Sequence, residues 1–195
     1  MKNKIVCLVG MCGSGKSKVA DFFISKNYQY IRFGQITLDE VKRKGLKPNE
    51  ENERPIREGF RKKYGQGAFA VLNIPKFDEA LKNGNVVGDG LYSWEEYKIL
   101  KEKYGNNLFV IAIYASPEIR YKRLANRATK YRDDPKMKYR SFGPKDAKDR
   151  DYAEIENSDK GGPIAMADYT IINEGNLEEL REKILVIFNK IIAKI

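Results

Sequence analysis

Eight residues close to the N-terminus have the types and the spacing of a phosphate-binding loop. They match the pattern G-x-x-x-x-G-K-[ST] and read Gly10-Met11-Cys12-Gly13-Ser14-Gly15-Lys16-Ser17. Glycine adopts φ values that other residues avoid, so three glycines allow successive backbone N–H groups to turn toward one anion. We therefore predict that this loop holds the phosphates of a nucleoside triphosphate through Gly10, Gly13, Ser14, Gly15, Lys16 and Ser17.

The segments on either side of the loop are those that this chemistry needs. Residues 4–9 are an apolar run of strand length, and residues 16–24 have one apolar helical face. The N-terminus of that helix adds a partial positive charge at the phosphates. Lys16 is then expected to reach the β- and γ-phosphates, and the Ser17 hydroxyl to bind Mg²⁺. The alternative is a chance glycine-rich turn, which this strand–loop–helix context disfavours.

A carboxylate follows a second apolar run. Asp89 comes directly after residues 85–88, Asn-Val-Val-Gly. At the end of a strand parallel to the first one, it can order Mg²⁺ through water or take a proton from an acceptor hydroxyl. The alternative is a plain Asp-Gly turn. We favour the functional interpretation and predict Asp89 as a catalytic or metal-binding residue.

Arg54, Arg57 and Arg61 are spaced three and four residues apart in a stretch of helical character. A guanidinium binds phosphate through two parallel hydrogen bonds, so such a helical face can hold the phosphate of an acceptor. A solvated helix face, which Lys62 and Lys63 also suit, is an equally good interpretation of each single arginine.

A second set of arginines, Arg120, Arg123 and Arg127, is expected to form another such cationic helical face, which leads into a strongly basic segment. Residues 120–150 contain twelve Lys or Arg and four Asp, so they carry +8 of the net charge of +10. Over a triphosphate, Arg123 and Arg127 can stabilise charge on the transferred phosphoryl group. The alternative is nucleic-acid binding, with Tyr131, Tyr139 and Phe142 interleaved among the cations.

Composition limits the remaining possibilities. The chain has 195 residues, which is enough for one domain with a core of its own. It has no histidine, which excludes triads and metal sites built on His. Cys7 and Cys12 form neither a disulfide framework nor a metal-ligand spacing, which fits a reducing cytoplasm. The apolar runs are too short to span a bilayer.

Five apolar runs of strand length alternate with stretches of helical character. Strands are expected at residues 4–9, 28–33, 85–88, 108–114 and 169–172, and helices at 16–24, 36–44, 50–64, 68–82, 94–104, 117–127 and from 177 onward. Strands that alternate with helices predict an α/β fold with a parallel sheet and helices on both faces. Asp89 and the glycine-rich loop then share the carboxyl edge, where ligands bind.

Less regular stretches limit the prediction. Pro55 is expected to restart a helix that begins after Asn49, at a first-turn position. Residues 128–150 have no assignable pattern. Residues 151–167 begin as a helix that we expect to break at Gly161-Gly162-Pro163.

Over almost its whole length the chain resembles a mainly archaeal group of P-loop kinases described as adenylate-kinase-related or dephospho-CoA-kinase-like. Besides the loop at residues 10–17, the blocks that carry the resemblance are Phe33-Gly34, residues 40–46, residues 61–65, Asp89-Gly90, residues 115–118 with Arg120, residues 165–169 and Asn173-Glu174-Gly175.

The resemblance implies an adenylate-kinase-like P-loop NTPase fold in one domain, with a helical acceptor-binding region at about 35–82 and a lid at about 123–155. It also implies ATP and Mg²⁺ as cofactors. The chain departs from the family pattern twice, with Gln35 in place of an aspartate and Tyr92 in place of an arginine. Both departures concern the acceptor end, where Gln35 is expected to contact the substrate.

The leading hypothesis is therefore a kinase that moves the γ-phosphate of ATP to a nucleotide-type acceptor, such as a nucleoside monophosphate. Dephospho-CoA kinase is the alternative within the same class of enzyme. A nucleotide-switched protein that binds RNA or ribosomal particles is the alternative from another class, and we favour the enzyme.

Overall fold

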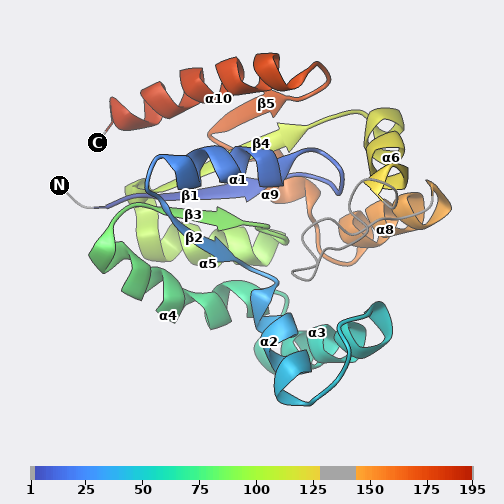
Figure 1. Ribbon diagram of the computed structural model, residues 1–195. Helices are drawn as coiled ribbons and strands as arrows, with labels where there is room; N and C mark the ends of the chain where they lie inside the picture. Colours follow the sequence, from blue (N-terminus) through green and yellow to red (C-terminus); the bar gives the residue numbers. More distant parts are fainter. Residues whose placement is uncertain (1–2, 128–143, 195) are drawn as a thin grey trace.

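The computed structural model describes residues 3–127 and 144–194. Five strands form one sheet in the order β2-β3-β1-β4-β5, and every neighbouring pair is parallel (Figure 1). The strands are β1 (Ile5–Val9), β2 (Gln29–Arg32), β3 (Val86–Asp89), β4 (Leu108–Tyr114) and β5 (Tyr169–Ile172). The predicted five-stranded parallel sheet is confirmed.

Strand β1 lies at the centre of the sheet. All five of its residues are buried, as expected for an apolar strand that is covered on both faces. Leu8 is in register with Asp89 of β3, and Val9 with Ala112 of β4. The glycine-rich loop therefore leaves the sheet at the middle of its carboxyl edge, next to Asp89.

Helices cover both faces of the sheet. They are α1 (Lys16–Ser25), α2 (Gln35–Arg43), α3 (Glu50–Tyr64), α4 (Ala68–Asn83), α5 (Trp94–Tyr104), α6 (Pro117–Ala125), α8 (Pro144–Glu156), α9 (Gly161–Ala165) and α10 (Leu177–Ile192), with a 3-10 turn at Gly105–Asn107. Helices α1 and α10 lie on one face, and α4 and α5 on the other (Figure 1). None of the helices in the described ranges is both long and apolar enough to cross a membrane.

The sheet separates two apolar clusters, which makes the fold three-layered, as predicted. On one side, the rings of Phe23 in α1 and Phe188 in α10 meet edge to face with centroids 5.8 Å apart. On the other side, Phe77 of α4 and Leu100 of α5 are fully buried. Burial of a side chain of this size contributes about 2 kcal/mol, so the two clusters hold the sheet firmly between the helices.

Helices α2 and α3 project from the body of the molecule near the carboxyl edge of the sheet (Figure 1). The side chain of Asn49 caps α3 by accepting a hydrogen bond from the N–H of Asn52 at 2.9 Å, as its residue type predicts. The expected restart at Pro55 is wrong, because α3 is continuous through this residue. Only one backbone N–H is missing there, and the helix tolerates its loss.

The expected break at Gly161-Gly162-Pro163 is also wrong, because these residues begin α9. Pro163 lies in the first turn of that helix, where its missing N–H removes no helical hydrogen bond. The interruption instead lies between Glu156 and Gly161, where Asp159 adopts a φ of 47°. Residues 144–150, which had no assignable pattern, belong to α8.

Candidate functional site

The glycine-rich loop between β1 and α1 is a cradle that only glycines can form. Gly10, Gly13 and Gly15 have φ values of 147°, 83° and 107°, a region that other residues rarely adopt. Added Cβ atoms would lie 2.3 Å from the carbonyl oxygen of Ile113, 2.8 Å from that of Arg120 and 2.2 Å from Nδ2 of Asn173, respectively. The loop therefore has the backbone geometry that brings N–H groups together around a phosphate.

Lys16 points back across this loop. Its Nζ donates hydrogen bonds to the carbonyl oxygens of Gly10 at 2.8 Å and Met11 at 3.1 Å. Burial and, after it, the nearby charge of Lys160 lower the pKa of Lys16 to about 8. Ser17 follows in the first turn of α1. The Oγ of Ser14 is fully buried and has no hydrogen-bond partner among the residues that the structure describes.

Two residues far along the chain fix the loop in place. Asn173, directly after β5, donates from Nδ2 to the carbonyl oxygen of Ser14 at 2.7 Å. Arg120 of α6 donates to the carbonyl oxygen of Cys12 at 3.1 Å, and its guanidinium pairs with Asp151 of α8 at 2.6 Å. Arg120 is only 4% exposed. It therefore supports the loop from behind, and the expectation that it shares an open cationic face with Arg123 and Arg127 is wrong.

Arg123 and Arg127 lie at the end of α6 and just beyond it. The guanidinium of Arg123 donates to the carbonyl oxygen of Asn173 at 2.9 Å, and partial burial lowers its pKa. Asn173 also contacts Ser14 of the loop, so Arg123 is linked to the loop through Asn173. Arg127 is half-buried. Most of the basic segment, including Tyr131, Tyr139 and Phe142, lies outside the described residues.

Asp89 stands at the carboxyl end of β3, half-buried, beside the loop. Its Oδ2 accepts a hydrogen bond from the hydroxyl of Tyr30 at 3.0 Å. Its charge also acts to raise the pKa of Lys16, against the larger opposing effects of burial and Lys160. Within residues 3–127 and 144–194, no group of three or more Cys, Asp or Glu side chains could hold a metal ion. A Mg²⁺ ion here would need phosphate oxygens and water besides Ser17 and Asp89, which is its usual coordination.

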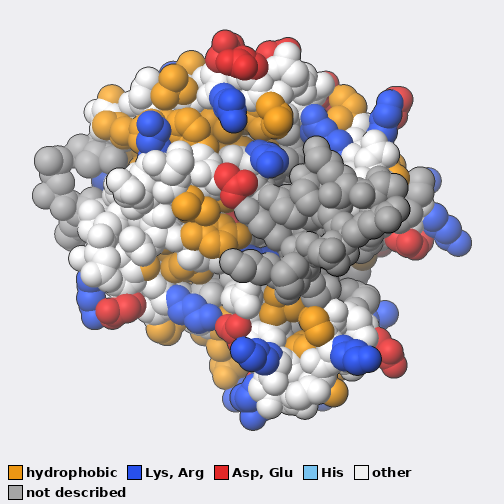
Figure 2. All heavy atoms as spheres, viewed as in Figure 1, with side chains coloured by type: hydrophobic (Ala, Val, Ile, Leu, Met, Phe, Trp, Pro, Cys, Tyr) orange, Lys and Arg blue, Asp and Glu red, His pale blue; other side chains and the backbone are white. Residues whose placement is uncertain are grey.

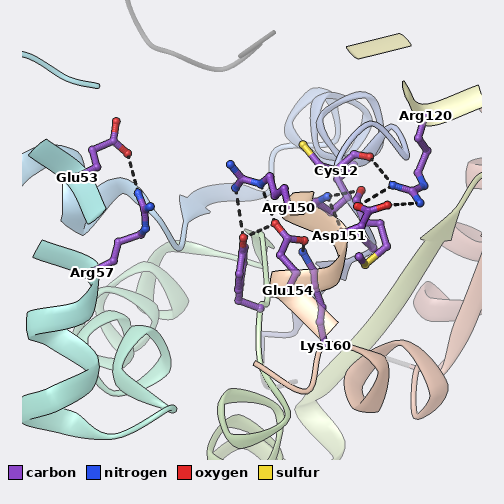
Figure 3. Close-up of polar contacts among 12 residues, drawn as sticks. Cys12, Glu53, Arg57, Arg120, Arg150, Asp151, Glu154 and Lys160 are labelled. Carbon is purple, nitrogen blue, oxygen red and sulfur yellow. Dashed lines mark hydrogen bonds and ion pairs between the residues drawn. The ribbon is translucent and has the colours of Figure 1, made fainter. Parts of the chain in front are cut away.

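The three arginines of α3 have different partners in the structure. Arg54 pairs with Glu58 at 2.8 Å with 69% of its side chain exposed, and Arg57 lies 3.4 Å from Glu53 (Figure 3). Arg61 instead lies over the rings of Phe69 and Tyr92, with its carbon Cζ 5.6 and 5.9 Å from their centroids. The buried Nε of Arg61 has no hydrogen-bond partner in the described part of the chain.

Gln35 begins α2 and is exposed. Its Nε2 donates to Oδ1 of Asp39 on the same helix at 3.0 Å. Of the four residues expected to bind the acceptor, Arg61 alone has a buried polar atom that lacks a described partner.

A polar cluster next to the loop, in which Glu154 and Lys160 are buried, was not predicted. Tyr92 follows β3, and its hydroxyl hydrogen-bonds to Oε1 of Glu154. The same carboxylate pairs with Arg150 at 2.9 Å and Lys160 at 2.6 Å, and Arg150 also donates to the Tyr92 hydroxyl at 3.2 Å (Figure 3). Burial alone would raise the pKa of Glu154, but Lys160 and Arg150 hold it well below its usual range.

Comparison with known proteins agrees with this geometry. The profile of a family described as an AAA domain matches residues 6–161. UPF0200 protein TK1334 of Thermococcus kodakarensis is 32% identical over 98% of this chain and 100% of its own length. The chain belongs to the UPF0200 family. A second UPF0200 protein, from Sulfurisphaera tokodaii, is 35% identical over 92% of this chain and 93% of its own length.

Solved structures show the same fold in distant kinases. Shikimate kinase from Bacteroides thetaiotaomicron superimposes with a TM-score of 0.58 at 13% identity, over 96% of this chain and 97% of its own. A gluconokinase from Sinorhizobium meliloti gives 0.56 at 15% identity, over 97% and 93%. This UPF0200 protein therefore has the nucleotide-binding P-loop fold of kinases.

Proposed function

We propose that this UPF0200 protein is an ATP-dependent kinase that transfers the γ-phosphate to a nucleotide-type acceptor. The observation that carries the proposal is the glycine cradle with the half-buried Lys16 beside Asp89, at the carboxyl edge of the sheet. An ammonium that is partly withdrawn from water, next to backbone amides turned toward the same place, favours an anion there. A triphosphate supplies that anion. The neighbouring carboxylate of Asp89 can then take part in phosphoryl transfer, either at the metal ion or as a proton acceptor.

Each residue of the loop then has a role. The amides of residues 13–17 and the ammonium of Lys16 hold the phosphates. Ser17 and Asp89 would hold Mg²⁺, Asp89 through water. When bound, this ion neutralises charge between the β- and γ-phosphates.

The transfer itself requires little covalent chemistry of the protein. An oxygen of the acceptor bonds to the γ-phosphorus, the bond from that phosphorus to the β–γ bridging oxygen breaks, and ADP leaves. Asp89 takes the proton when the acceptor group is a hydroxyl. Arg123 and Arg127 stabilise the charge on the moving phosphoryl group, and positioning supplies the rest.

The acceptor phosphate is expected beside α2 and α3, within a helical acceptor-binding region at about 35–82. Arg61 is the best candidate to bind it because its buried Nε lacks a described partner. Gln35, Arg54 and Arg57 already have partners on their own helices, so they would contribute only after rearrangement. The lid at about 123–155 and the cytoplasmic location stay predictions.

A screen for ADP formation tests the proposal. Purified protein with MgATP is incubated with each nucleoside monophosphate and with dephospho-CoA, which also covers the alternative of dephospho-CoA kinase. We expect ADP release that saturates with one acceptor and is at background without it. ATP binding with no acceptor-dependent ADP release for any of these compounds would count against the kinase.

The RNA-binding alternative makes a different prediction. On the face shown in Figure 2, Lys and Arg side chains are interspersed with acidic and hydrophobic ones, so the described residues form no single basic surface there. RNA binding would weaken steeply with salt, because each phosphate contact releases counterions. A titration of RNA affinity against salt concentration therefore distinguishes the two functions.

A further inference from the structure

Asn173 connects three parts of the site. It lies directly after β5 and is 6% exposed. Its backbone N–H donates to the carbonyl oxygen of Tyr114 at 2.8 Å, and its own carbonyl oxygen accepts a hydrogen bond from Arg123 at 2.9 Å. Its side-chain Nδ2 donates to the carbonyl oxygen of Ser14 at 2.7 Å. The backbone of Asn173 is therefore held by β4 and α6, and its side chain is directed at the phosphate-binding loop.

The contact with Ser14 determines how one peptide group of the loop is oriented. A peptide group is planar and trans, so its C=O and its N–H point in opposite directions. The Ser14 carbonyl is held toward Asn173, and the N–H of Gly15 belongs to the same peptide group, so it points away from Asn173. The two residues are in close contact, because a Cβ atom on Gly15 would lie 2.2 Å from Nδ2 of Asn173.

Arg120 orients the peptide group that lies two residues earlier. Its Nη1 donates to the carbonyl oxygen of Cys12 at 3.1 Å, and Asp151 holds the same guanidinium at 2.6 Å (Figure 3). The N–H of Gly13 therefore points away from Arg120. Two alternate peptide groups of the loop thus have their carbonyls held by side chains from outside the loop.

The glycines of the loop permit this orientation but do not select it. Glycine adopts positive and negative φ values about equally well, so a peptide group next to a glycine can turn over at little cost. A peptide group that turned over would present its carbonyl oxygen to a bound phosphate in place of its N–H. The partial negative charge of that oxygen repels an anion, whereas successive N–H groups attract it. Side chains that bond to the carbonyls therefore select the arrangement that binds phosphate.

We propose that Asn173 is a positioning residue that aims the N–H of Gly15 at the phosphates, and that Arg120 aims the N–H of Gly13 in the same way. That these phosphates belong to ATP rests on the proposed function. The orientation of the two N–H groups toward an anion does not, because it depends only on the contacts of the loop.

The test compares Asn173→Leu with the wild-type chain, using inorganic pyrophosphate as the probe. Leucine is similar to asparagine in size and shape and cannot donate a hydrogen bond to Ser14. We expect the dissociation constant for pyrophosphate, measured by titration calorimetry, to rise by about tenfold, because a hydrogen bond from a backbone N–H to a charged oxygen is lost.

Asn176→Leu is the matched control, because it makes the same change three residues later at an exposed position. Asn176 caps α10 by accepting a hydrogen bond from the N–H of Glu179 at 3.0 Å. Loss of this cap should lower the melting temperature, while the affinity for pyrophosphate stays at the wild-type value. Equal affinities in the two variants, or no binding of pyrophosphate by the wild-type chain, would overturn the proposal.

A measurement on the unaltered chain keeps the test decisive if Asn173→Leu does not fold. Ser14-Gly15 is the only Ser-Gly pair in the sequence, and Cys12-Gly13 is the only Cys-Gly pair. Labelling glycine with ¹⁵N, and the carbonyl carbon of either serine or cysteine with ¹³C, therefore isolates one amide resonance in each sample. We expect both resonances to move downfield when pyrophosphate is added, because each N–H then donates to a charged oxygen.

The two resonances test the two residues separately. A Gly15 resonance that stays in place would refute the role of Asn173, and a Gly13 resonance that stays in place would refute the role of Arg120. If both resonances move and Asn173→Leu weakens binding, but no acceptor yields ADP, the positioning role stands and the kinase assignment fails.

Discussion

The two ends of the candidate site are built in opposite ways. At the nucleotide end, ion pairs and hydrogen bonds join residues far apart in sequence, such as Arg120 with Asp151 and Asn173 with Ser14, and these groups are buried. At the acceptor end, Arg54 pairs within its own helix on the surface. Buried pairs are lost only with the fold, whereas an exposed pair costs little to break.

This difference indicates which parts are already in place before a substrate binds. The phosphate-binding loop is fixed from three sides, by β1, α6 and the residue after β5. On the projecting helices α2 and α3, the exposed contacts of Gln35 with Asp39 and of Arg54 with Glu58 are ones that a ligand can replace. The nucleotide end is therefore preorganised, whereas the acceptor end is expected to rearrange when a ligand binds.

The strongest test of the nucleotide end is Lys16→Ala. Turnover should fall by about a thousandfold or more, because the ammonium acts on the transferred phosphoryl group. The fold should remain, since among the described residues Nζ donates hydrogen bonds to the carbonyl oxygens of Gly10 and Met11, both in its own loop. The control is Lys18→Ala, which removes an exposed lysine from the same helix. Its turnover should stay within about twofold of the wild-type value. Unchanged ADP release from Lys16→Ala would show that the Lys16 ammonium does not act on the transferred phosphoryl group.

The second test measures the stability that the buried pair gives to this end. Arg120→Met should lower the free energy of unfolding by about 3–5 kcal/mol, because it leaves Asp151 as an unpaired buried charge. Arg54→Met, at the acceptor end, should cost less than about 1 kcal/mol. Urea denaturation of both variants gives the comparison. Similar losses would mean that the two ends do not differ as described.

These contrasts also explain what the sequence could predict. The loop at residues 10–17 was predictable because its conformation depends on glycines within it and on the strand and helix that flank it. The partnership of Arg120 with Asp151 was not, because it forms only when α6 and α8 pack together. The helical spacing of Arg54, Arg57 and Arg61 is correct, but spacing cannot tell which arginine finds a glutamate on its own helix.

The polar cluster was missed for the same reason. Glu154 and Lys160 stand on either side of a helix end, and Tyr92 lies more than sixty residues earlier. In the sequence Glu154 and Lys160 are ordinary residues of a charged protein, and Tyr92 is notable only as a departure from the family pattern. The fold alone removes Glu154 and Lys160 from water, which strengthens the interaction between their charges.

A third prediction concerns Glu96, which lies between the two ends and caps α5. Burial raises its pKa from 4.5 to about 7, despite hydrogen bonds from the N–H groups of Tyr92 and Ser93. The folded chain therefore keeps a proton that the unfolded chain releases between these values. Stability should fall as pH rises from about 4.5 to 7, by roughly 3 kcal/mol in total.

Glu96→Gln should remove this fall, because glutamine stays neutral and still accepts the backbone hydrogen bonds. Chemical denaturation across pH 4–8 measures it. The control is Glu95→Gln, which alters a more exposed neighbour paired with Lys98 and should leave the pH dependence in place. A pH dependence that survives in Glu96→Gln would assign the titration to other groups.

A fourth prediction uses the lowered pKa of Lys16, about 8. Phosphates favour the charged ammonium, so bound nucleotide should raise this pKa. Affinity for MgATP is then fully present below pH 8 and declines above it, by up to about tenfold per pH unit until the pKa of the complex is reached. Calorimetric titration at pH 7, 8 and 9 checks this, and a constant affinity would show that Lys16 does not face the phosphates.

The smallest expected effect distinguishes the arginines of the acceptor end from one another. Arg61→Met should raise KM for the acceptor found in the screen by about five- to tenfold, with less change in KM for ATP, because one charge-assisted hydrogen bond to phosphate is lost. Arg54→Met makes the same chemical change on the same helix and should leave both constants within about twofold. Since the two variants differ only in whether the guanidinium is stacked on aromatic rings or paired on the surface, unequal effects would locate the acceptor phosphate at Arg61. Equal effects would place it along the whole face of α3 and show that the surface ion pairs open when the acceptor binds.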